Sequence, residues 1–378
     1  MTALYIHIPF CLSKCPYCSF ASWPGQESRH RPYVKAVIAE LRQIAATLAA
    51  SQPPALTTLF IGGGTPTVLA ENLLLQVIAT CQELFPFAGN GEFTCEANPG
   101  TLRPRLLTAL REAGINRLSL GVQSFDDTEL RLLGRAHDAR AATEAVALVK
   151  KAGFANFSLD LMYGLPRQSA ADWQRNLETA LAFKPPHLSL YQLTIDDGTP
   201  FASRYQPGQP PMPAEEEILA MDALNQTLCG QAGLRQYEIS NFARPGYECR
   251  HNLTYWRNEE YLAVGAAAVS YIAGKRQGRL IEPEHYRAAI ERGEKAIAWS
   301  EELSPEAAFR ETMVMGLRLN AGVELARLRQ RFGIDALTYY REALAKLMAA
   351  GFIQHTDGYL RLTEAGRLIA NQVLAELV

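Results

Sequence analysis

Three cysteines stand close together in the stretch Cys11-Leu12-Ser13-Lys14-Cys15-Pro16-Tyr17-Cys18, directly after the apolar run Leu4–Ile8. Cysteine thiolates are the usual ligands of iron–sulfur clusters, and three on one loop can hold three corners of a cubane cluster. Position 20 is Phe20 rather than a fourth cysteine, so one iron would stay open to another ligand. Structural zinc is the alternative, but such a site usually takes four ligands from two separated pairs, and the other cysteines stand singly. The spacing therefore favours a cluster.

Composition places the chain among soluble globular proteins. Apolar residues make up 48% of its 378 residues, charged residues 20%, and the net charge is -2. No strong positive field is present to recruit nucleic acid or anionic lipid. No secretory signal pattern precedes the first strand, and no apolar run reaches the roughly 20 residues of a membrane helix. With seven cysteines, three of them in one loop, we expect the reducing cytosol or the cytosolic face of a membrane.

Short apolar runs alternate with longer amphipathic stretches from residue 4 to about residue 195. The runs predict six strands: Leu4–Ile8, Thr58–Ile61, Glu92–Glu96, Arg117–Val122, Phe157–Met162 and His187–Leu193. The stretches predict helices at Tyr33–Leu48, Asn72–Leu84, Pro104–Ala113, Ala141–Lys151 and Ala171–Phe183. Strands that are each followed by a helix indicate a parallel sheet. The fold class is therefore α/β, an incomplete (β/α)6 barrel of the TIM type, with an open doubly wound sheet as the alternative.

Unusual polar or glycine-rich sequences follow the predicted strands at their carboxyl ends. They are the cysteine loop, Gly62-Gly63-Gly64-Thr65-Pro66, Glu96-Ala97-Asn98-Pro99, Gln123-Ser124, Asp160, and Gln192 with Thr194. Active sites of parallel barrels are built at that end of the strands. We therefore expect one site at this rim.

The chain after residue 200 divides further. We expect a barrel domain at 1–200, a connecting segment at 201–303 and a C-terminal α+β domain resembling a winged helix at 304–378. The connecting segment carries a predicted helix at Glu215–Cys229 and a predicted strand at Gln236–Phe242. Asp357-Gly358 predicts a hairpin in the last domain. That domain has nine basic and eight acidic side chains without a basic stripe, so a lid or docking role is favoured over DNA binding.

The cysteine spacing resembles that of the radical SAM enzymes, whose open cluster iron binds S-adenosylmethionine (SAM). In that reading Glu96 pairs with the SAM ammonium group, Asp160 binds ribose hydroxyls, and Gln123 and Arg135 donate to the ribose and the carboxylate. The glycine run offers free N–H groups to the ligand, and it lacks the lysine of a P-loop. Tyr5 and Tyr17 could pack against the adenine. Taken singly, each of these residues is more often structural.

His251, in His251-Asn252-Leu253-Thr254-Tyr255-Trp256, is a candidate axial ligand for heme iron, which a neutral imidazole suits. A structural histidine with satisfied hydrogen bonds is the alternative. Cys249 stands two residues earlier, but nothing completes a metal site there.

Five motifs together resemble the oxygen-independent coproporphyrinogen III oxidase-like radical SAM family over nearly the entire chain. They are Tyr5–Cys11, the glycine run, Glu96–Pro99, Gly121-Val122-Gln123-Ser124-Phe125 and Leu159-Asp160-Leu161-Met162-Tyr163-Gly164-Leu165-Pro166. The resemblance implies a [4Fe–4S] cluster on Cys11, Cys15 and Cys18. It implies SAM contacts at Tyr5, Tyr17, Gly63, Gly64, Thr65, Glu96, Gln123, Arg135 and Asp160.

Three features favour the heme chaperone branch of this family over the oxidase. The oxidase has a cysteine where this chain has Phe20, and it carries a long segment before its cluster, whereas ten residues precede Cys11 here. The sequence from His251 to Trp256 fits the H-N-x-x-Y-W motif of the chaperones, which implicates His251 in heme binding. One departure is that Ala267 and Val269 replace the usual glycine and histidine of a later G-x-G-A-H-S-like stretch.

The resemblance thus implies a chaperone that binds heme and delivers it to heme proteins such as membrane-bound respiratory subunits, without oxidase activity. A radical SAM enzyme acting on coproporphyrinogen III or another tetrapyrrole is the alternative, and a binding module without SAM is a third class. We expect no nucleic-acid partner, and dimerisation is left open.

Overall fold

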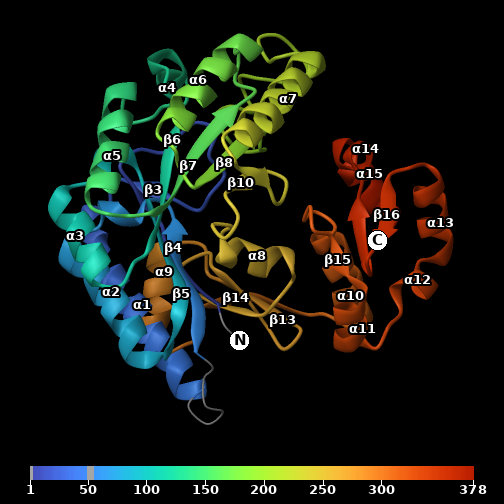
Figure 1. The fold of residues 1–378 in the computed structure, drawn as a ribbon. Coiled ribbons are helices and arrows are strands. Elements are labelled where there is room, and N and C mark those ends of the chain that lie inside the picture. The colour runs from blue at the N-terminus through green and yellow to red at the C-terminus, as the bar shows by residue number, and fades with distance from the viewer. Residues whose placement is uncertain (1–2, 49–54) are drawn as a thin grey trace.

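The protein, described by a computed structural model over residues 3–48 and 55–378, is built on one large mixed sheet (Figure 1). Its centre consists of six parallel strands in the order of the chain: β1 (Ala3–Ile8), β4 (Leu56–Gly63), β5 (Phe87–Ala97), β6 (Arg117–Gln123), β7 (Asn156–Tyr163) and β8 (His187–Gln192). The predicted α/β architecture with six parallel strands is confirmed. Residues 1–2 and 49–54 of the predicted barrel domain lie outside the described residues.

Helices cover the outer face of these strands (Figure 1). They are α1 (Glu27–Leu48), α2 (Glu71–Leu84), α3 (Pro104–Glu112), α4 (Asp127–Leu132), α5 (Ala139–Lys151), α6 (Ala170–Ala182) and α7 (Glu215–Gln231), with short 3-10 turns at Pro66–Val68 and Pro99–Thr101. In β1 the alternate residues Leu4, Ile6 and Ile8 are fully buried in the core. Burying each such side chain contributes roughly 1.5–3 kcal/mol. Because side chains alternate along a strand, Tyr5 and His7 face the opposite, inner side of the sheet.

The segment after residue 200 extends both ends of the central sheet. Beside β8 stand β10 (Asn241–Ala243) and β9 (Arg235–Gln236), both antiparallel. Beside β1 stands β11 (Tyr261–Val264), parallel to it, followed by the antiparallel strands β12 (Val269–Ile272), β13 (Lys275–Arg279) and β14 (Ile297–Glu302). Within the described residues β1 and β8 do not pair with each other, so the barrel remains open on that side.

The single strand predicted at Gln236–Phe242 is wrong. Two short strands, β9 and β10, form a hairpin there. Glu238 stabilises the reversal, because its carboxylate accepts hydrogen bonds from the Ser240 N–H and the Asn241 side chain. Helix α8 (Arg250–Trp256) then connects β10 to β11, and Figure 1 shows it between β10 and β14; α9 (Pro283–Glu291) lies between β13 and β14 in the sequence.

The last part of the chain has its own hydrophobic core, formed by residues between Phe309 and Leu377. Its helices are α10 (Pro305–Gly316), α11 (Leu325–Phe332), α12 (Ala336–Tyr339), α13 (Arg341–Ala349), α14 (Glu364–Leu368) and α15 (Ala370–Ala375). Its strands are β15 (Val323–Glu324), β16 (Ile353–Thr356) and β17 (Tyr359–Leu362), the last two joined by the expected hairpin turn at Asp357-Gly358. The domain boundaries at residues 200 and 303 remain predictions.

No helix within residues 3–48 and 55–378 is both long enough and apolar enough to cross a bilayer.

Candidate functional site: a three-cysteine loop beside an open barrel

The cysteine loop is anchored to the rim of the barrel. Cys11 belongs to the short strand β2 (Phe10–Cys11), which pairs with β3 (Trp23–Pro24), and the Cys18 N–H donates to the Cys15 carbonyl at 3.1 Å. The Thr65 hydroxyl lies 3.7 Å from Cys11 Sγ, and Arg135 Nη1 lies 3.4 Å from Cys15 Sγ. Burial raises the pKa of the Cys11 and Cys18 thiols, and the charge of neighbouring cysteines raises each further. The loop therefore offers three half-buried thiols to a metal group that can displace their protons.

The glycine run after β4 packs tightly against the strand that leads to the cysteines. Gly63 has a φ of 110°, and a Cβ there would lie 2.4 Å from the His7 ring. Three N–H groups of the run donate within the protein: Gly63 to Glu96 Oε2 at 3.0 Å, Gly64 to the Ile8 carbonyl at 2.8 Å and Thr65 to the Phe10 carbonyl at 2.7 Å. The expectation of free N–H groups is therefore wrong for these three residues, because the run connects β1, β2 and β5.

Glu96 and Asp160 lie on the inner face of neighbouring parts of the sheet. Burial, and then the negative charge of Asp160, raise the pKa of Glu96 to about 7. Asp160 accepts hydrogen bonds of 2.8 Å from both Ser119 and Ser158, which oppose the effect of burial in raising its pKa. Two buried carboxylates thus face the inner side of the sheet from β5 and β7, and both can accept hydrogen bonds from a polar ligand.

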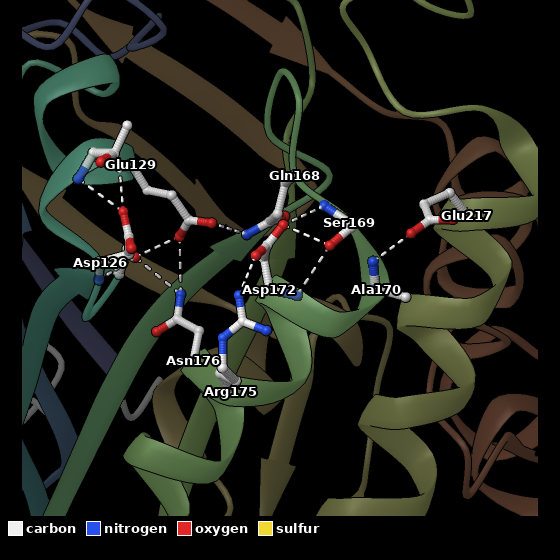
Figure 2. Close-up of polar contacts among 11 residues, drawn as sticks. Asp126, Glu129, Gln168, Ser169, Ala170, Asp172, Arg175, Asn176 and Glu217 are labelled. Carbon is white, nitrogen blue, oxygen red and sulfur yellow. Dashed lines mark hydrogen bonds and ion pairs between the residues drawn. The ribbon is translucent and has the colours of Figure 1, made fainter.

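A network of polar side chains fixes the loop after β6, which begins at Gln123. Figure 2 shows Glu129 between Gln168 and Asn176. Glu129 accepts hydrogen bonds from Ser124 at 2.5 Å, Gln168 at 2.8 Å and Asn176 at 3.1 Å. Burial raises the pKa of Glu129, and the hydrogen bonds from Ser124 and Gln168 oppose that rise. Glu129, Gln168 and Asn176 are among the residues that line a cavity of about 600 Å³. The network holds Ser124, the residue after Gln123, whose φ of 68° accompanies a register shift in β6.

Tyr5 and Tyr17 lie in different surroundings. The Tyr5 hydroxyl is 2.9 Å from His7 Nδ1, and its ring centre is 6.1 Å from that of Phe60 on the inner face. The Tyr17 ring lies 6.1 Å from that of Phe201, and burial raises its pKa. The structure thus places Tyr5 with the barrel residues and Tyr17 with the cysteine loop.

His251 is buried against the inner face of the sheet, with only 1% of its surface exposed. Both ring nitrogens have partners, since Nδ1 lies 2.9 Å from the Thr58 hydroxyl and Nε2 lies 2.8 Å from the Tyr255 hydroxyl. The ring stacks on Phe60 at 5.1 Å. Burial, assisted by the charge of Arg117, lowers the pKa of His251 to about 3, so the imidazole is neutral. In this conformation neither ring nitrogen is free for a metal ion.

Sequence reasoning missed the residues that hold α8 in place. Glu92 on β5 accepts hydrogen bonds of 3.1 Å from the Arg250 and His251 N–H groups at the start of α8. Arg117, 2% exposed on β6, supplies positive charge nearby. The sequence held one signal that pointed to Glu92. It stands four residues before Glu96 in the same strand, so both side chains face the same side of the sheet.

Of the two departures, Ala267 lies in the turn between β11 and β12, and Val269 is the first residue of β12. Ala267 has a φ of 61°, which costs a non-glycine residue roughly 1 kcal/mol. A glycine at this position would adopt the same conformation without that cost. The Gly265 N–H donates to Glu40, so the turn is fixed to α1.

The donor chemistry fits an iron–sulfur cluster. Among the described residues, no three His, Cys, Asp or Glu side chains gather as closely as a single ion requires. A cubane cluster instead takes each thiolate at a separate iron. The three thiols share one loop, and Glu96, Gln123 and Asp160 follow at the carboxyl ends of the next strands, as a ligand bound beside the cluster would need. The fold and this site define a radical SAM protein.

Comparison with known proteins agrees with that class. Residues 5–180 match the model of the radical SAM superfamily, and residues 303–369 match the HemN C-terminal domain. The heme chaperone HemW of Bacillus subtilis is 37% identical over 99% of this chain and 98% of its own length. HemW of Escherichia coli is 35% identical over 98% and 97%. The structure of coproporphyrinogen III oxidase (HemN) from Escherichia coli matches the whole chain with a TM-score of 0.87, covers 89% of that protein and is 23% identical, so it shows the fold.

The chain belongs to the HemW family of radical SAM proteins. The resemblance drawn from the motifs, including the choice of the chaperone branch, is thereby confirmed. The family implies a [4Fe–4S] cluster and SAM, and the assignment of individual residues to these groups remains a prediction.

Proposed function

We propose that this protein is a heme chaperone that binds heme and delivers it to other heme proteins while carrying a [4Fe–4S] cluster and SAM. The observation that carries the proposal is similarity to HemW proteins over 99% of the chain. The geometry adds that the H-N-x-x-Y-W helix, α8, packs on the inner face of the sheet beside Tyr5.

The cluster and SAM are assigned to the rim. Cys11, Cys15 and Cys18 would hold three irons, and the fourth iron, when the cluster is bound, would take SAM as a ligand and supply it with an electron. Glu96 would accept the SAM ammonium group, and Asp160 with Gln123 would bind the ribose hydroxyls. The remaining proposed contacts, which form the wall of the site, are Tyr5, Tyr17, Gly63, Gly64, Thr65 and Arg135. SAM can serve structure and regulation here as well as radical chemistry.

The heme site is assigned to His251. Its neutral imidazole is the form that binds iron. Because Tyr255 occupies Nε2, ligation requires that the Tyr255 hydroxyl move away from this nitrogen. We place heme on the side of α8 that carries these two residues.

The acceptors are proposed to be respiratory heme proteins, including membrane-bound subunits met at the membrane surface, and a homodimer is the proposed assembly. Transfer is tested by mixing the heme-loaded protein with an apo-cytochrome and following the acceptor's absorption spectrum. Sedimentation of the loaded and unloaded forms measures the assembly. A protein that retains its heme contradicts delivery, and an unchanged monomer contradicts the dimer.

The decisive experiment compares chaperone and oxidase activity under anaerobic conditions. The reconstituted protein is incubated with coproporphyrinogen III, SAM and a reductant, and decarboxylated products are sought by chromatography. Heme is titrated in parallel into the wild type, His251→Ala and Thr58→Ala; the last removes one hydrogen bond of the imidazole and keeps the ring. We expect no product and weaker heme binding only in His251→Ala. Product at many turnovers overturns the chaperone proposal, and equal heme binding by all three overturns the assignment of His251.

A further inference from the structure

Arg135 is in contact with a cysteine of the cluster loop rather than only with the space proposed for SAM. It follows α4, and its Nη1 donates to Cys15 Sγ at 3.4 Å. Its Nη2 donates to Asn98 Oδ1 at 2.5 Å and to the Gly121 carbonyl at 2.7 Å. These two acceptors fix Nη2, and this keeps Nη1 of the same guanidinium beside the Cys15 sulfur.

The backbone around Arg135 is pressed against the same loop. A Cβ at Gly134 would lie 2.7 Å from the Pro16 ring, directly after Cys15. The space between the two segments is a cavity of about 20 Å³, whose lining includes Cys15, Arg135 and His137. A cavity of that size holds one water molecule at most. Arg135 and Cys15 are both half-buried, so the charge of Arg135 acts on Cys15 with less screening than between two fully exposed groups.

We infer that Arg135 is a positioning residue for Cys15 and raises the reduction potential of the cluster through this contact. The inference rests on the proposed cluster. Reduction adds one electron and hence one negative charge to the cluster and its thiolates. A fixed cation beside a thiolate stabilises the reduced form more than the oxidised form, and hydrogen bonds to the sulfurs are a known determinant of cluster potential.

The expected size follows from the loss of one charged hydrogen bond. Replacing the guanidinium by an uncharged side chain should lower the equilibrium constant for one-electron reduction about tenfold, which corresponds to about 59 mV. Lysine keeps the charge without the fixed fork, so Arg135→Lys should fall between wild type and Arg135→Met.

The test is a redox titration of the reconstituted cluster without SAM, followed by electron paramagnetic resonance. It compares wild type, Arg135→Met, Arg135→Lys and the control Arg103→Met, whose guanidinium donates to the Gly100 and Leu102 carbonyls. Iron and sulfide content and SAM affinity by equilibrium dialysis are measured on the same samples. We expect equal iron content, a more negative midpoint potential in Arg135→Met, an intermediate one in Arg135→Lys and no change in the control.

Each other outcome has a defined meaning. An unchanged potential in Arg135→Met, with SAM affinity lost, overturns the inference and leaves Arg135 as a SAM ligand alone. Loss of iron from Arg135→Met while Arg135→Lys keeps it supports the positioning role by a second route. Absence of iron and sulfide from the wild type overturns the proposed cluster itself, which separates that failure from the failure of the inference.

Discussion

Glu96 must lose its proton before it can form an ion pair with an ammonium group, and burial raises the pKa at which it does so. Its folded pKa of about 7 lies above the ordinary 4.5, so the folded protein binds this proton more tightly than the unfolded chain. The stability that this provides is complete below pH 4.5 and disappears as pH rises through about 7. The loss amounts to about 3 kcal/mol in the absence of ligand.

Urea unfolding at pH 5, 6, 7 and 8 checks this, with Glu96→Gln compared to wild type. The difference in unfolding free energy between the two should move by about 3 kcal/mol in favour of the variant across the range. The exposed Glu83→Gln on α2 serves as the control and should give a constant difference. A constant difference for Glu96→Gln as well would show that its proton affinity is ordinary.

Tyr255 competes with any metal for His251. Tyr255→Phe removes the hydroxyl at 2.8 Å from Nε2 and keeps the ring, so we expect tighter heme binding, by about fivefold for one hydrogen bond of roughly 1 kcal/mol. Absorption titration with heme measures this. Tyr261→Phe, whose ring packs on Tyr255 at 4.6 Å, is the matched control. Weaker binding in Tyr255→Phe would instead make the tyrosine itself part of the heme site.

Motifs were sufficient to predict the family, but not the hydrogen-bond partners of the candidate site residues, whose roles stay predictions. Cys11, Cys15 and Cys18 lie within a stretch of eight residues, so their proximity follows from the sequence. The contact between Arg135 and Cys15 joins residues 120 positions apart. Such a pairing depends on the packing of the loops and has no local pattern in the sequence.

At the level of the element, α8 is short and depends on partners from other strands. Seven residues cannot form a stable helix alone, and Glu92 supplies acceptors to its first N–H groups. Glu92→Ala removes these acceptors and takes one of the carboxylates away from the buried Arg117, which keeps Asp160 nearby. We expect a loss of about 3 kcal/mol in unfolding free energy and faster amide exchange in residues 250–256.

Hydrogen exchange with mass spectrometry and urea unfolding measure the two effects. The control is Glu248→Ala, because Glu248 accepts from the exposed Gly246 N–H and has no contact of this kind with α8. If exchange in residues 250–256 stayed unchanged in Glu92→Ala, the helix would be held by its packing alone.

The strands and helices of the β/α units were predictable because each has a strong local pattern. The hairpin of β9 and β10 was not, since Tyr237 to Ser240 continue an apolar and polar alternation that resembles a strand. The buried carboxylate of Glu238 overrides that alternation by accepting from residues just ahead of it. The strand propensity of this segment therefore gave a wrong prediction, because the buried Glu238 and its hydrogen bonds favour a turn.

At the level of the whole molecule, the C-terminal core is separate from the barrel core. Leu360 on β17 is fully buried in it, and Leu360→Ala should cost about 3 kcal/mol in the unfolding of this region. Calorimetry measures the shift, and iron content should remain that of the wild type. Leu337→Ala, at a site 36% exposed, should change stability much less. Loss of iron in Leu360→Ala would show that the barrel depends on this core.

Sequence patterns predicted the six central strands in order but not the twelve-stranded sheet. Strands such as β10 and β11 are three and four residues long and carry no signal for which edge they join. Their choice follows from the unpaired backbone groups of β8 and β1, which need partners once the barrel stays open.

The connection from Ala243 at the end of β10 to Tyr261 at the start of β11 runs between the strands that flank the open side of the barrel, because β10 pairs with β8 and β11 pairs with β1. The number of residues in this connection sets an upper limit on the distance between β10 and β11. A shorter connection would lower that limit, and a longer one would raise it. Because His251 lies on α8 within this connection, the permitted width of the open side and the place of the histidine depend on the same segment of chain.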